Sequence, residues 1–295
     1  MPKQQQLSLY STCDITGKAV VKNELLVEKL EDFLARHTNL YFPHDHQFYQ
    51  FVLFTGGRGG YSIDFVNFPV EIGHAYFMVP GQVHSWNFDN VKGYIINFSG
   101  RFLQSFVSIP RYLEKFSVLS GYVPEKDIDL SHDQGLPKIL DQMIPGAGKA
   151  GELKNDRIKV ELLRLIIDIE DRLERPGLTK NKRKQIELVQ NFKQLIGHHY
   201  LGHRPVSAYA KELSITTNHL NTLCRKVTGQ TAGDLVRERL VLEAKRLLIN
   251  SRVTILEISN KLNFIDNSYF SKFFKKHTGL TPEKFRSDIL PHYIG

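Results

Sequence analysis

Two stretches near the end of the chain, residues 206–229 and residues 255–279, repeat one another. The first reads VSAYAKEL at Val206–Leu213, TTNHL at Thr216–Leu220 and LCRKVTG at Leu223–Gly229. The second reads ILEISNKL at Ile255–Leu262, DNSYF at Asp266–Phe270 and FFKKHTG at Phe273–Gly279. Each copy predicts a short helix, a turn that ends in a capping residue, and a basic second helix closed by Thr-Gly. The sequence therefore predicts a helix-turn-helix twice, offset by 49 residues before the turn and by 50 after it.

The second helix of each copy has an apolar stripe at helical spacing, which leaves its polar residues facing outward. Such a helix can place its first turn in a DNA groove. The candidate DNA contacts are Asn218, Asn221, Thr222, Arg225 and Lys226 in the first copy, and Asn267, Ser268, Ser271, Lys272, Lys275 and Lys276 in the second. We expect Asn221 and Lys272 to reach base edges, and Lys275 and Lys276 to touch phosphate. One long amphipathic helix, predicted from Thr231 to about residue 250, fixes the distance between the copies.

The stretch Ser268–Arg286 (SYFSKFFKKHTGLTPEKFR) resembles the signature of the AraC/XylS family of bacterial transcription regulators. Residues 244–248 (AKRLL) resemble the linker helix of that family, and the match covers roughly residues 185–287. One departure is Ser259–Phe264, which reads SNKLNF where the family has Ala-x-x-Leu-Gly-Phe. Asn tolerates positive φ better than most residues, so we expect Asn263 to hold the turn. The resemblance implies a sequence-specific, DNA-binding transcription regulator.

Charge is distributed unevenly along the 295 residues, a length that favours two domains. Residues 179–295 carry 20 Lys and Arg against 9 Asp and Glu, whereas residues 1–178 carry 19 against 22. A basic second half is typical of a domain that binds a phosphate backbone. The two cysteines, Cys13 and Cys224, have no disulfide or zinc-site spacing. No apolar run is long enough to span a membrane, and residues 1–6 lack the apolar core of a signal peptide, so we expect a cytoplasmic protein.

The first hundred residues contain short β-branched and aromatic runs separated by Gly and Pro, which favour a small β-barrel or sandwich. The glycine-rich run Gly56–Gly60 (GGRGG) is not followed by Gly-Lys-Ser/Thr, so we predict a hairpin turn there rather than a phosphate-binding loop.

The motifs PHDH at residues 43–46 and PGQVHSWN at residues 80–87 resemble the two motifs of a cupin barrel, of the kind that precedes AraC-type DNA-binding domains. The resemblance implies an effector site, for which the candidates are His44, His46, His84, Trp86 and Tyr94. Gln50 stands where metal-binding cupins have Glu, and an amide is a weak ligand for a divalent cation. We therefore predict no metal and no cofactor, although three imidazoles alone can hold zinc. A sugar, an aromatic acid and a small lipid suit these residue types equally well as the effector.

Residues 156–173 predict an amphipathic helix with an apolar stripe at Ile158, Leu162, Leu165, Ile169 and Leu173. Such a stripe usually packs on its own domain. In regulators of this resemblance, however, the helical segment after the barrel pairs two subunits, and the spacing suits a short antiparallel contact. We therefore expect a homodimer through residues 156–173. The run that follows, residues 175–184 (RPGLTKNKRK), has the composition of a polar linker.

Taken together, the sequence predicts an α+β protein. Residues 1–175 would form a cupin-like effector-binding and dimerisation domain, residues 176–185 a linker, and residues 186–295 an all-α domain with two helix-turn-helix units joined by a long helix. The predicted function is transcription regulation controlled by a small-molecule effector, with double-stranded operator or promoter DNA and RNA polymerase as partners and no membrane. The alternatives are a metal-dependent cupin enzyme or sensor tethered to DNA, and an architectural DNA binder. We identify no catalytic residues, because no nucleophile, paired carboxylates or complete metal set can be recognised.

Overall fold

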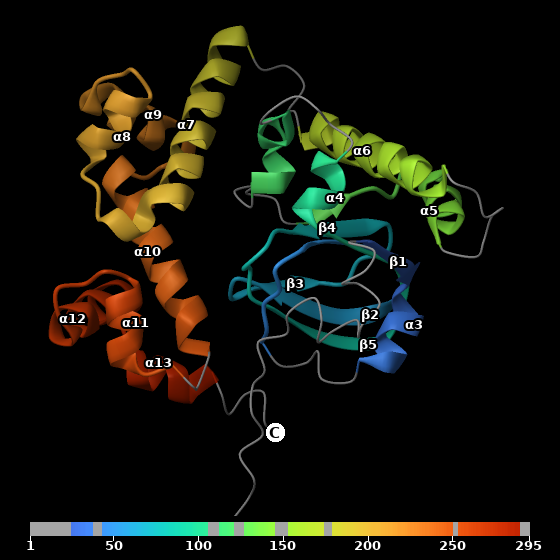
Figure 1. Cartoon of the computed structure of the whole chain (residues 1–295), viewed down its shortest axis with the longest axis horizontal. Coiled ribbons are helices and arrows are strands. Elements are labelled where there is room, and N and C mark those ends of the chain that lie inside the picture. Colours follow the sequence, from blue (N-terminus) through green and yellow to red (C-terminus); the bar gives the residue numbers. More distant parts are fainter. Residues whose placement is uncertain are drawn as a thin grey trace, which may run out of the picture. The chain divides into compact units, whose positions relative to one another are not determined.

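The computed structural model describes residues 25–37, 43–105, 112–120, 127–144, 153–173, 179–249 and 253–289. These residues fall into two compact units, one up to residue 173 and the other from residue 179 on. We call them the sheet unit and the helical unit and describe each by itself (Figure 1).

Six antiparallel strands form one sheet in the sheet unit. They are β1 (Leu25–Lys29), β2 (Tyr49–Ile63), β3 (Val66–Pro69), β4 (His74–Met78), β5 (His84–Phe98) and β6 (Asp127–Asp129). The order is β1-β5-β2-β4-β6, and β3 pairs with β2 beside this path. The strands β2 and β5, each 15 residues long, pair from Tyr49 opposite Phe98 to Ile63 opposite His84. The expected antiparallel β domain is confirmed, while the described strands form an open path rather than a closed ring.

The glycine-rich run Gly56–Gly60 lies inside β2, so the hairpin turn predicted there is wrong. β2 shifts its register against β5 twice at the start of this run, as β-bulges do. Gly57 has a φ of +92°, and a Cβ on it would lie 2.3 Å from the Cα of Val91. Glycine is therefore required for the close approach of two strands. The chain reverses instead at Asp64 and Phe65, both at positive φ, between β2 and β3.

The two faces of the sheet carry separate apolar cores, because alternate residues of a strand point to opposite faces. One face packs against α4 (Gly100–Gln104), α5 (Leu136–Met143), α6 (Lys154–Leu173) and the 3-10 turns at Tyr112–Lys115 and Ser117–Ser120 (Figure 1). We call this the α6-side core; Phe51, Ile96 and Leu162 belong to it. The other face packs against α3 (Leu30–Arg36), and we call this the α3-side core; it includes Val52 and Ile95.

The helical unit contains the predicted helix-turn-helix pair. Its α-helices are α7 (Lys180–His199), α8 (Val206–Glu212), α9 (Thr217–Thr228), α10 (Ala232–Ile249), α11 (Ile255–Lys261), α12 (Asn267–Thr278) and α13 (Pro282–Ile289). Helix α7 packs on α8 and α9, and α13 packs on α10 and α12. Within the described ranges, no helix has both the length and the apolar content that crossing a bilayer requires.

Part of the predicted linker, residues 176–185, is helical. Helix α7 begins at Lys180, and the Thr179 hydroxyl accepts a hydrogen bond from the backbone N–H of Lys182 at 3.3 Å. This cap satisfies a backbone group that the first turn of a helix leaves unpaired. The basic residues 182–184 are exposed on that first turn. A helix start was mistaken for a linker because both are polar and rich in lysine.

Candidate nucleic-acid interface and effector site

The first helix-turn-helix unit, α8 and α9, is closed by a tight turn. The backbone N–H of Ile215 donates to the carbonyl oxygen of Ala210 at 3.0 Å, and Ser214 has a φ of 56°. The Thr216 hydroxyl then accepts from the backbone N–H of His219 at 3.2 Å and caps α9. The predicted cap is confirmed, and it starts α9 with its first backbone N–H groups facing outward.

The second unit, α11 and α12, repeats this geometry. The backbone N–H of Phe264 donates to the carbonyl oxygen of Ser259 at 3.0 Å, and Asn263 has a φ of 58°. The expectation that Asn263 holds the turn at positive φ is confirmed. The Asp266 carboxylate caps α12 by accepting from the backbone N–H of Tyr269 at 2.7 Å. A negative charge at this position also favours the helix dipole.

Four of the five candidate DNA contacts in the first unit are exposed on α9: Asn218, Thr222, Arg225 and Lys226. Asn221 is half-buried and engaged with the backbone. Its Oδ1 accepts from the backbone N–H of Ala232 at 3.1 Å, and its Nδ2 donates to the carbonyl oxygen of Thr217 at 3.2 Å. The Oδ1 atom therefore holds α9 to the start of α10, while Nδ2 bonds within the first turn of α9.

The candidate residues of the second unit lie along α12. Ser268, Lys272, Lys275 and Lys276 are exposed, whereas Asn267 and Ser271 are half-buried. The structure thus arranges the exposed lysines on a helix whose opposite side, with Phe270 and Phe274, is fully buried. This is the amphipathic arrangement that a groove-binding helix needs.

Three further side chains are exposed at the same helix ends and were not predicted from the sequence. His219 lies on α9, and Tyr269 occupies the matching position on α12 with 55% exposure. Ile265, directly before the α12 cap, is 93% exposed. The change of offset between the copies, from 49 to 50 residues, marks an added residue in the second turn and could have identified this position.

In the sheet unit, three of the predicted effector residues meet on one side of the sheet. The ring centroids of His44 and His84 lie 4.0 Å apart, and those of His46 and His84 lie 4.9 Å apart. Trp86 follows on β5 with its ring 5.6 Å from that of His84, and it belongs to the α3-side core. All four side chains are at least 96% buried. Because the histidines are enclosed by the protein, burial rather than contact with water sets their pKa values.

Burial makes these imidazoles poor bases. Desolvation, with a smaller contribution from His44, lowers the pKa of His46 to about 3, and the same causes lower the pKa of His84 well below its usual value. His46 and His84 are therefore neutral at physiological pH. In the described part of the chain, no group of three or more His, Cys, Asp or Glu side chains is arranged to hold a metal ion.

Two buried amide side chains lie on the same face of the sheet as this cluster. Gln50 on β2 is opposite Asn97 on β5, and both are 1% exposed. By strand alternation they share the face of Val52 and Ile95, which belong to the α3-side core. Within the described ranges, the Gln50 Oε1 atom and both polar atoms of the Asn97 amide have no hydrogen-bond partner. An unpaired buried polar group costs about 1–3 kcal/mol, so these atoms need an explanation beyond stability.

Tyr94, the fifth predicted effector residue, is not part of this cluster. It belongs to the α6-side core, and its hydroxyl accepts from Lys29 Nζ at 2.9 Å and donates to Asp141 Oδ1 at 3.0 Å. Burial raises the pKa of the Tyr94 hydroxyl. Tyr94 is next to Ile95 on β5, so the two side chains point to opposite faces of the sheet. On its own face, Tyr94 joins β5 to β1 and α5.

The apolar stripe predicted to pair two subunits is buried in its own unit. Helix α6 confirms the predicted helix, but Ile158, Leu162, Leu165 and Ile169 are all within the α6-side core and at most 5% exposed. This stripe covers apolar residues of the sheet together with α4, α5 and the 3-10 turns. The stripe therefore packs on its own sheet, and a contact between subunits would have to use another side of α6.

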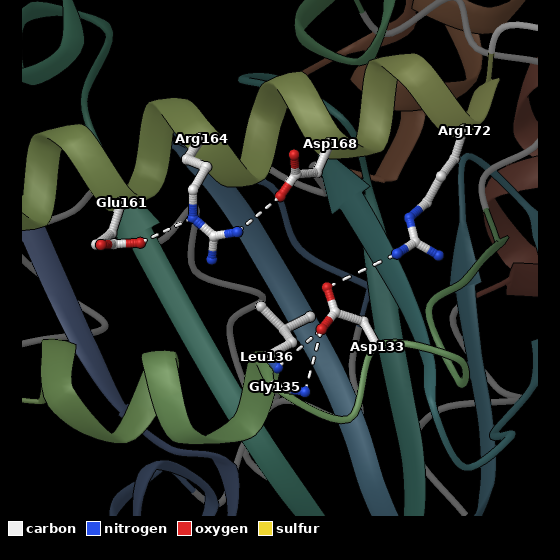
Figure 2. A network of polar contacts seen from close by, with 7 residues as sticks. All are labelled: Asp133, Gly135, Leu136, Glu161, Arg164, Asp168 and Arg172. Carbon is white, nitrogen blue, oxygen red and sulfur yellow. Dashed lines mark hydrogen bonds and ion pairs between the residues drawn. The ribbon is translucent and has the colours of Figure 1, made fainter.

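The polar residues of α6 are paired with one another and with the start of α5 (Figure 2). Arg164 donates to Glu161 and to Asp168, each at 3.0 Å. Arg172 lies 3.7 Å from Asp133, whose carboxylate also accepts from the first backbone N–H groups of α5. Exposed pairs of this kind add little stability individually.

Among the apolar residues of α6, Val160 is 48% exposed.

Comparison with known proteins gives two family matches. Residues 32–167 match the AraC-like ligand binding domain, and residues 209–288 match a helix-turn-helix domain. The Msm operon regulatory protein of Streptococcus mutans is 29% identical over 129 residues, which are 44% of this chain and 46% of that protein. The transcriptional activator RhaR of Escherichia coli K12 is 36% identical over 78 residues, 26% of this chain and 28% of that protein. The chain thus matches less than half the length of these curated relatives.

Among solved structures, ToxT from Vibrio cholerae strain SCE256, crystallised with an unsaturated fatty acid, is similar with a TM-score of 0.45 and 10% identity, over 90% of this chain and 95% of that one. The two family matches follow one another in the order of the two structural units, and residues 1–31, 168–208 and 289–295 lie outside them. With an AraC-like ligand-binding domain followed by a helix-turn-helix domain, the chain belongs to the AraC family of regulators.

Proposed function

We propose that this chain is a sequence-specific DNA-binding transcription regulator whose activity is controlled by a small molecule bound in the sheet unit. The observation that carries the proposal is the paired helix-turn-helix. Two units with the same turn hydrogen bond and the same type of cap lie in the basic half of the chain. Helix α10 joins them, and a regulator of this kind acts on chromosomal DNA in the cytoplasm.

The length of α10 supports binding of both units to one duplex. Its 18 residues give a helix of about 27 Å at the usual rise per residue. A rigid connection of that length can hold two recognition helices near the roughly 34 Å that separates successive major grooves on one face of DNA. Helices α9 and α12 would then enter neighbouring grooves.

The exposed residues of these helices divide into two roles. Lys272, Ser268 and Asn218 stand early enough on their helices to reach base edges, whereas Arg225, Lys226, Lys275 and Lys276 lie towards the helix ends and suit phosphate. Asn221 is better explained by its bond to Ala232 than by a bond to a base. Asn267 and Ser271 are half-buried and would contribute through contacts at the edge of the interface.

The effector would bind beside His46, His84 and Trp86 in the α3-side core, with His44 at the same cluster. Gln50 and Asn97 supply buried polar atoms that have no hydrogen-bond partner among the described residues. The polar groups gathered here are neutral imidazoles and amides, so an uncharged hydrogen-bonding molecule suits them better than a carboxylate does. This favours a sugar-like or other neutral compound over an aromatic acid. Tyr94, in the α6-side core, would at most transmit the effect of binding.

Two subunits would pair through the solvent side of α6, within residues 156–173, where Val160 is exposed. A homodimer doubles the DNA contacts, and RNA polymerase is the further partner that a transcription regulator requires. These partnerships rest on the family and on the exposed side of α6, because the apolar stripe itself packs inside the sheet unit.

The DNA-binding proposal is tested by selecting bound duplexes from a random library with the full chain at physiological salt, and then footprinting the selected duplex. We expect two protected segments per subunit, separated by one helical turn on the same face. Lys272→Ala, on the exposed side of α12, should change the selected sequence, whereas the matched control Lys211→Ala, on the exposed side of α8, should not. Selection that enriches no common sequence would contradict the proposal.

The effector site is tested by Asn97→Leu. Replacing an unsatisfied buried amide with an apolar group of similar size should stabilise the sheet unit by about 1–3 kcal/mol when no effector is present. The same change should abolish the thermal shift that an uncharged metabolite from a screening library gives with the unchanged chain. A variant that loses stability, or keeps its response to that metabolite, would remove Asn97 from the site.

A further inference from the structure

Ile265 is an added residue with no counterpart in the first helix-turn-helix unit. The turn hydrogen bonds align Phe264 with Ile215, because each donates to the carbonyl oxygen five residues earlier at 3.0 Å. The caps align Asp266 with Thr216. In the first unit the cap follows the aligned residue directly, whereas in the second unit Ile265 stands between them.

The added residue leaves a large aliphatic side chain in water. Ile265 is 93% exposed, whereas Ile215 is half-buried and packs on the core of the first unit. Phe264 is buried in the corresponding place, so the second turn already has its apolar contact without Ile265. Single exposed apolar residues are common on protein surfaces, so exposure alone does not indicate a role. The position of Ile265 does indicate a role, because this residue directly precedes the cap at the N-terminal end of α12, the proposed recognition helix.

We propose that Ile265 reads thymine by packing on its C5-methyl group in the major groove. This inference rests on the proposed DNA-binding function. The N-terminal end of a recognition helix is the part that faces base edges, and the thymine methyl is the apolar group that those edges present in the major groove. The exposed lysines Lys275 and Lys276, farther along α12, would hold the flanking phosphates.

The neighbours of Ile265 favour an apolar contact over a polar one. The Asp266 carboxylate is occupied by the backbone N–H of Tyr269, so it caps the helix. Tyr269 is itself 55% exposed one turn along and adds a second partly apolar surface. The first unit has His219 at the position of Tyr269 and no residue at the position of Ile265. The proposed contact with a thymine methyl group therefore belongs to the second unit.

The experiment replaces thymine by deoxyuridine, one position at a time, in the duplex that the full chain selects. This change removes only the methyl group and keeps base pairing. At one position in the segment protected by the second unit, the unchanged chain should lose about fourfold in affinity, the factor that corresponds to about 0.8 kcal/mol for one buried methyl group. Ile265→Ala should bind the thymine and deoxyuridine duplexes equally at that position.

Leu256→Ala is the matched control, because Leu256 is an exposed aliphatic residue of the same unit, 55% exposed on α11. It should keep the fourfold ratio, and circular dichroism should show both variants folded. The inference is overturned if no position in that segment responds to loss of the methyl group, or if Ile265→Ala keeps the ratio. If the unchanged chain prefers no sequence at all, the proposed function fails together with this inference, and that result is recognised before any variant is measured.

Discussion

The two helix-turn-helix copies have the same backbone but expose different chemistry. Both end their second helix with a glycine at positive φ, Gly229 at 77° and Gly279 at 80°. In both, a threonine hydroxyl near the end of that helix donates to the carbonyl oxygen four residues earlier at 2.8 Å, from Thr228 to Cys224 and from Thr278 to Phe274. These shared features are the ones that the fold requires, since they close a helix and satisfy its last backbone groups.

The differences lie on the outer surface and in the core. In the first copy, Asn221 bonds to Ala232, and the Thr222 hydroxyl donates to the carbonyl oxygen of Asn218 at 2.9 Å, so its polar side chains serve its own backbone. In the second copy, Lys272 stands at the position of Thr222 and is exposed. The comparison indicates that the first copy contributes mainly positioning and the second copy mainly reading and charge.

The largest effect is expected in the core, where Cys224 and Phe274 occupy matching, fully buried positions. Phe274→Ala should lower the free energy of unfolding of the helical unit by about 3–5 kcal/mol, because it leaves a cavity beside Phe270 and Phe285. Cys224→Ala removes a single buried sulfur atom and should cost much less. Urea denaturation followed by circular dichroism at 222 nm measures both changes.

The chain has a single tryptophan, Trp86, which lies in the sheet unit. Its fluorescence therefore reports unfolding of the sheet unit separately and serves as the internal control. A Phe274→Ala chain in which the fluorescence transition moves as much as the helical transition would show that the two units unfold together. If Cys224→Ala and Phe274→Ala lowered the free energy of unfolding equally, the core of the second helix-turn-helix unit would not depend more strongly on its buried side chain than the core of the first.

The next effect concerns DNA reading by Lys272 and Thr222. Lys272→Ala should cost about 1–3 kcal/mol on the selected duplex and change which bases matter, because an exposed lysine can reach base edges. Thr222→Ala should cost less, because its hydroxyl is bonded to the backbone. Lys276→Ala is the comparison for a phosphate contact, and it should weaken binding to all sequences alike and reduce the salt slope by about one unit.

Equilibrium binding to the selected and to scrambled duplexes, over a series of salt concentrations, separates these outcomes. If Lys272→Ala and Lys276→Ala weaken both duplexes equally, α12 does not read bases through Lys272. If Thr222→Ala costs as much as Lys272→Ala, the first copy reads bases as well, and the division of labour between the copies is wrong.

The helical unit could be predicted from the sequence because its signals are local. Caps such as Thr216 and Asp266 act within three residues, and Asn263 takes positive φ because the turn is tight. The bonds of Asn221 to the backbone could not be predicted, for the opposite reason. A helical wheel places it outward, but its partner Ala232 belongs to the next helix, and sequence spacing cannot show that the two come together.

The sheet unit was less predictable because its contacts are remote in sequence. The run Gly56–Gly60 reads as a turn, yet its close approach to β5 depends on residues about 35 positions later, around Val91. The stripe of α6 suits a partner helix equally well, and only the sheet face shows that it is already covered. Motif resemblance brought His44, His46 and His84 together correctly, whereas Tyr94 was grouped with them although strand parity puts it on the other face.

A smaller effect is expected at Asn221 and its counterpart Ser271. Asn221→Ala should lower the stability of the helical unit by about 1 kcal/mol, because the backbone N–H of Ala232 at the start of α10 loses its acceptor. Base preference in the selection experiment should stay unchanged. Ser271→Ala should have no measurable effect on stability. An Asn221→Ala chain with normal stability and an altered base preference would restore Asn221 as a reader.

The smallest effect is expected at the two turn residues, and its sign should differ between the copies. A non-glycine residue at positive φ destabilises the folded state by about 1–2 kcal/mol. Glycine removes this strain, but it raises the conformational entropy of the unfolded chain, which costs about 0.5–1 kcal/mol of stability. Ser214→Gly, at a φ of 56°, should therefore stabilise the first unit by about 0.5 kcal/mol, or roughly 2–4 °C in Tm. Asn263 tolerates its φ of 58° better, and its Nδ2 donates to the carbonyl oxygen of Leu201 at 3.2 Å, so Asn263→Gly should slightly destabilise. Thermal melts at 222 nm that move in the same direction for both variants would mean that the two turns are strained alike, and that Asn263 is not adapted to its turn beyond what Ser214 is.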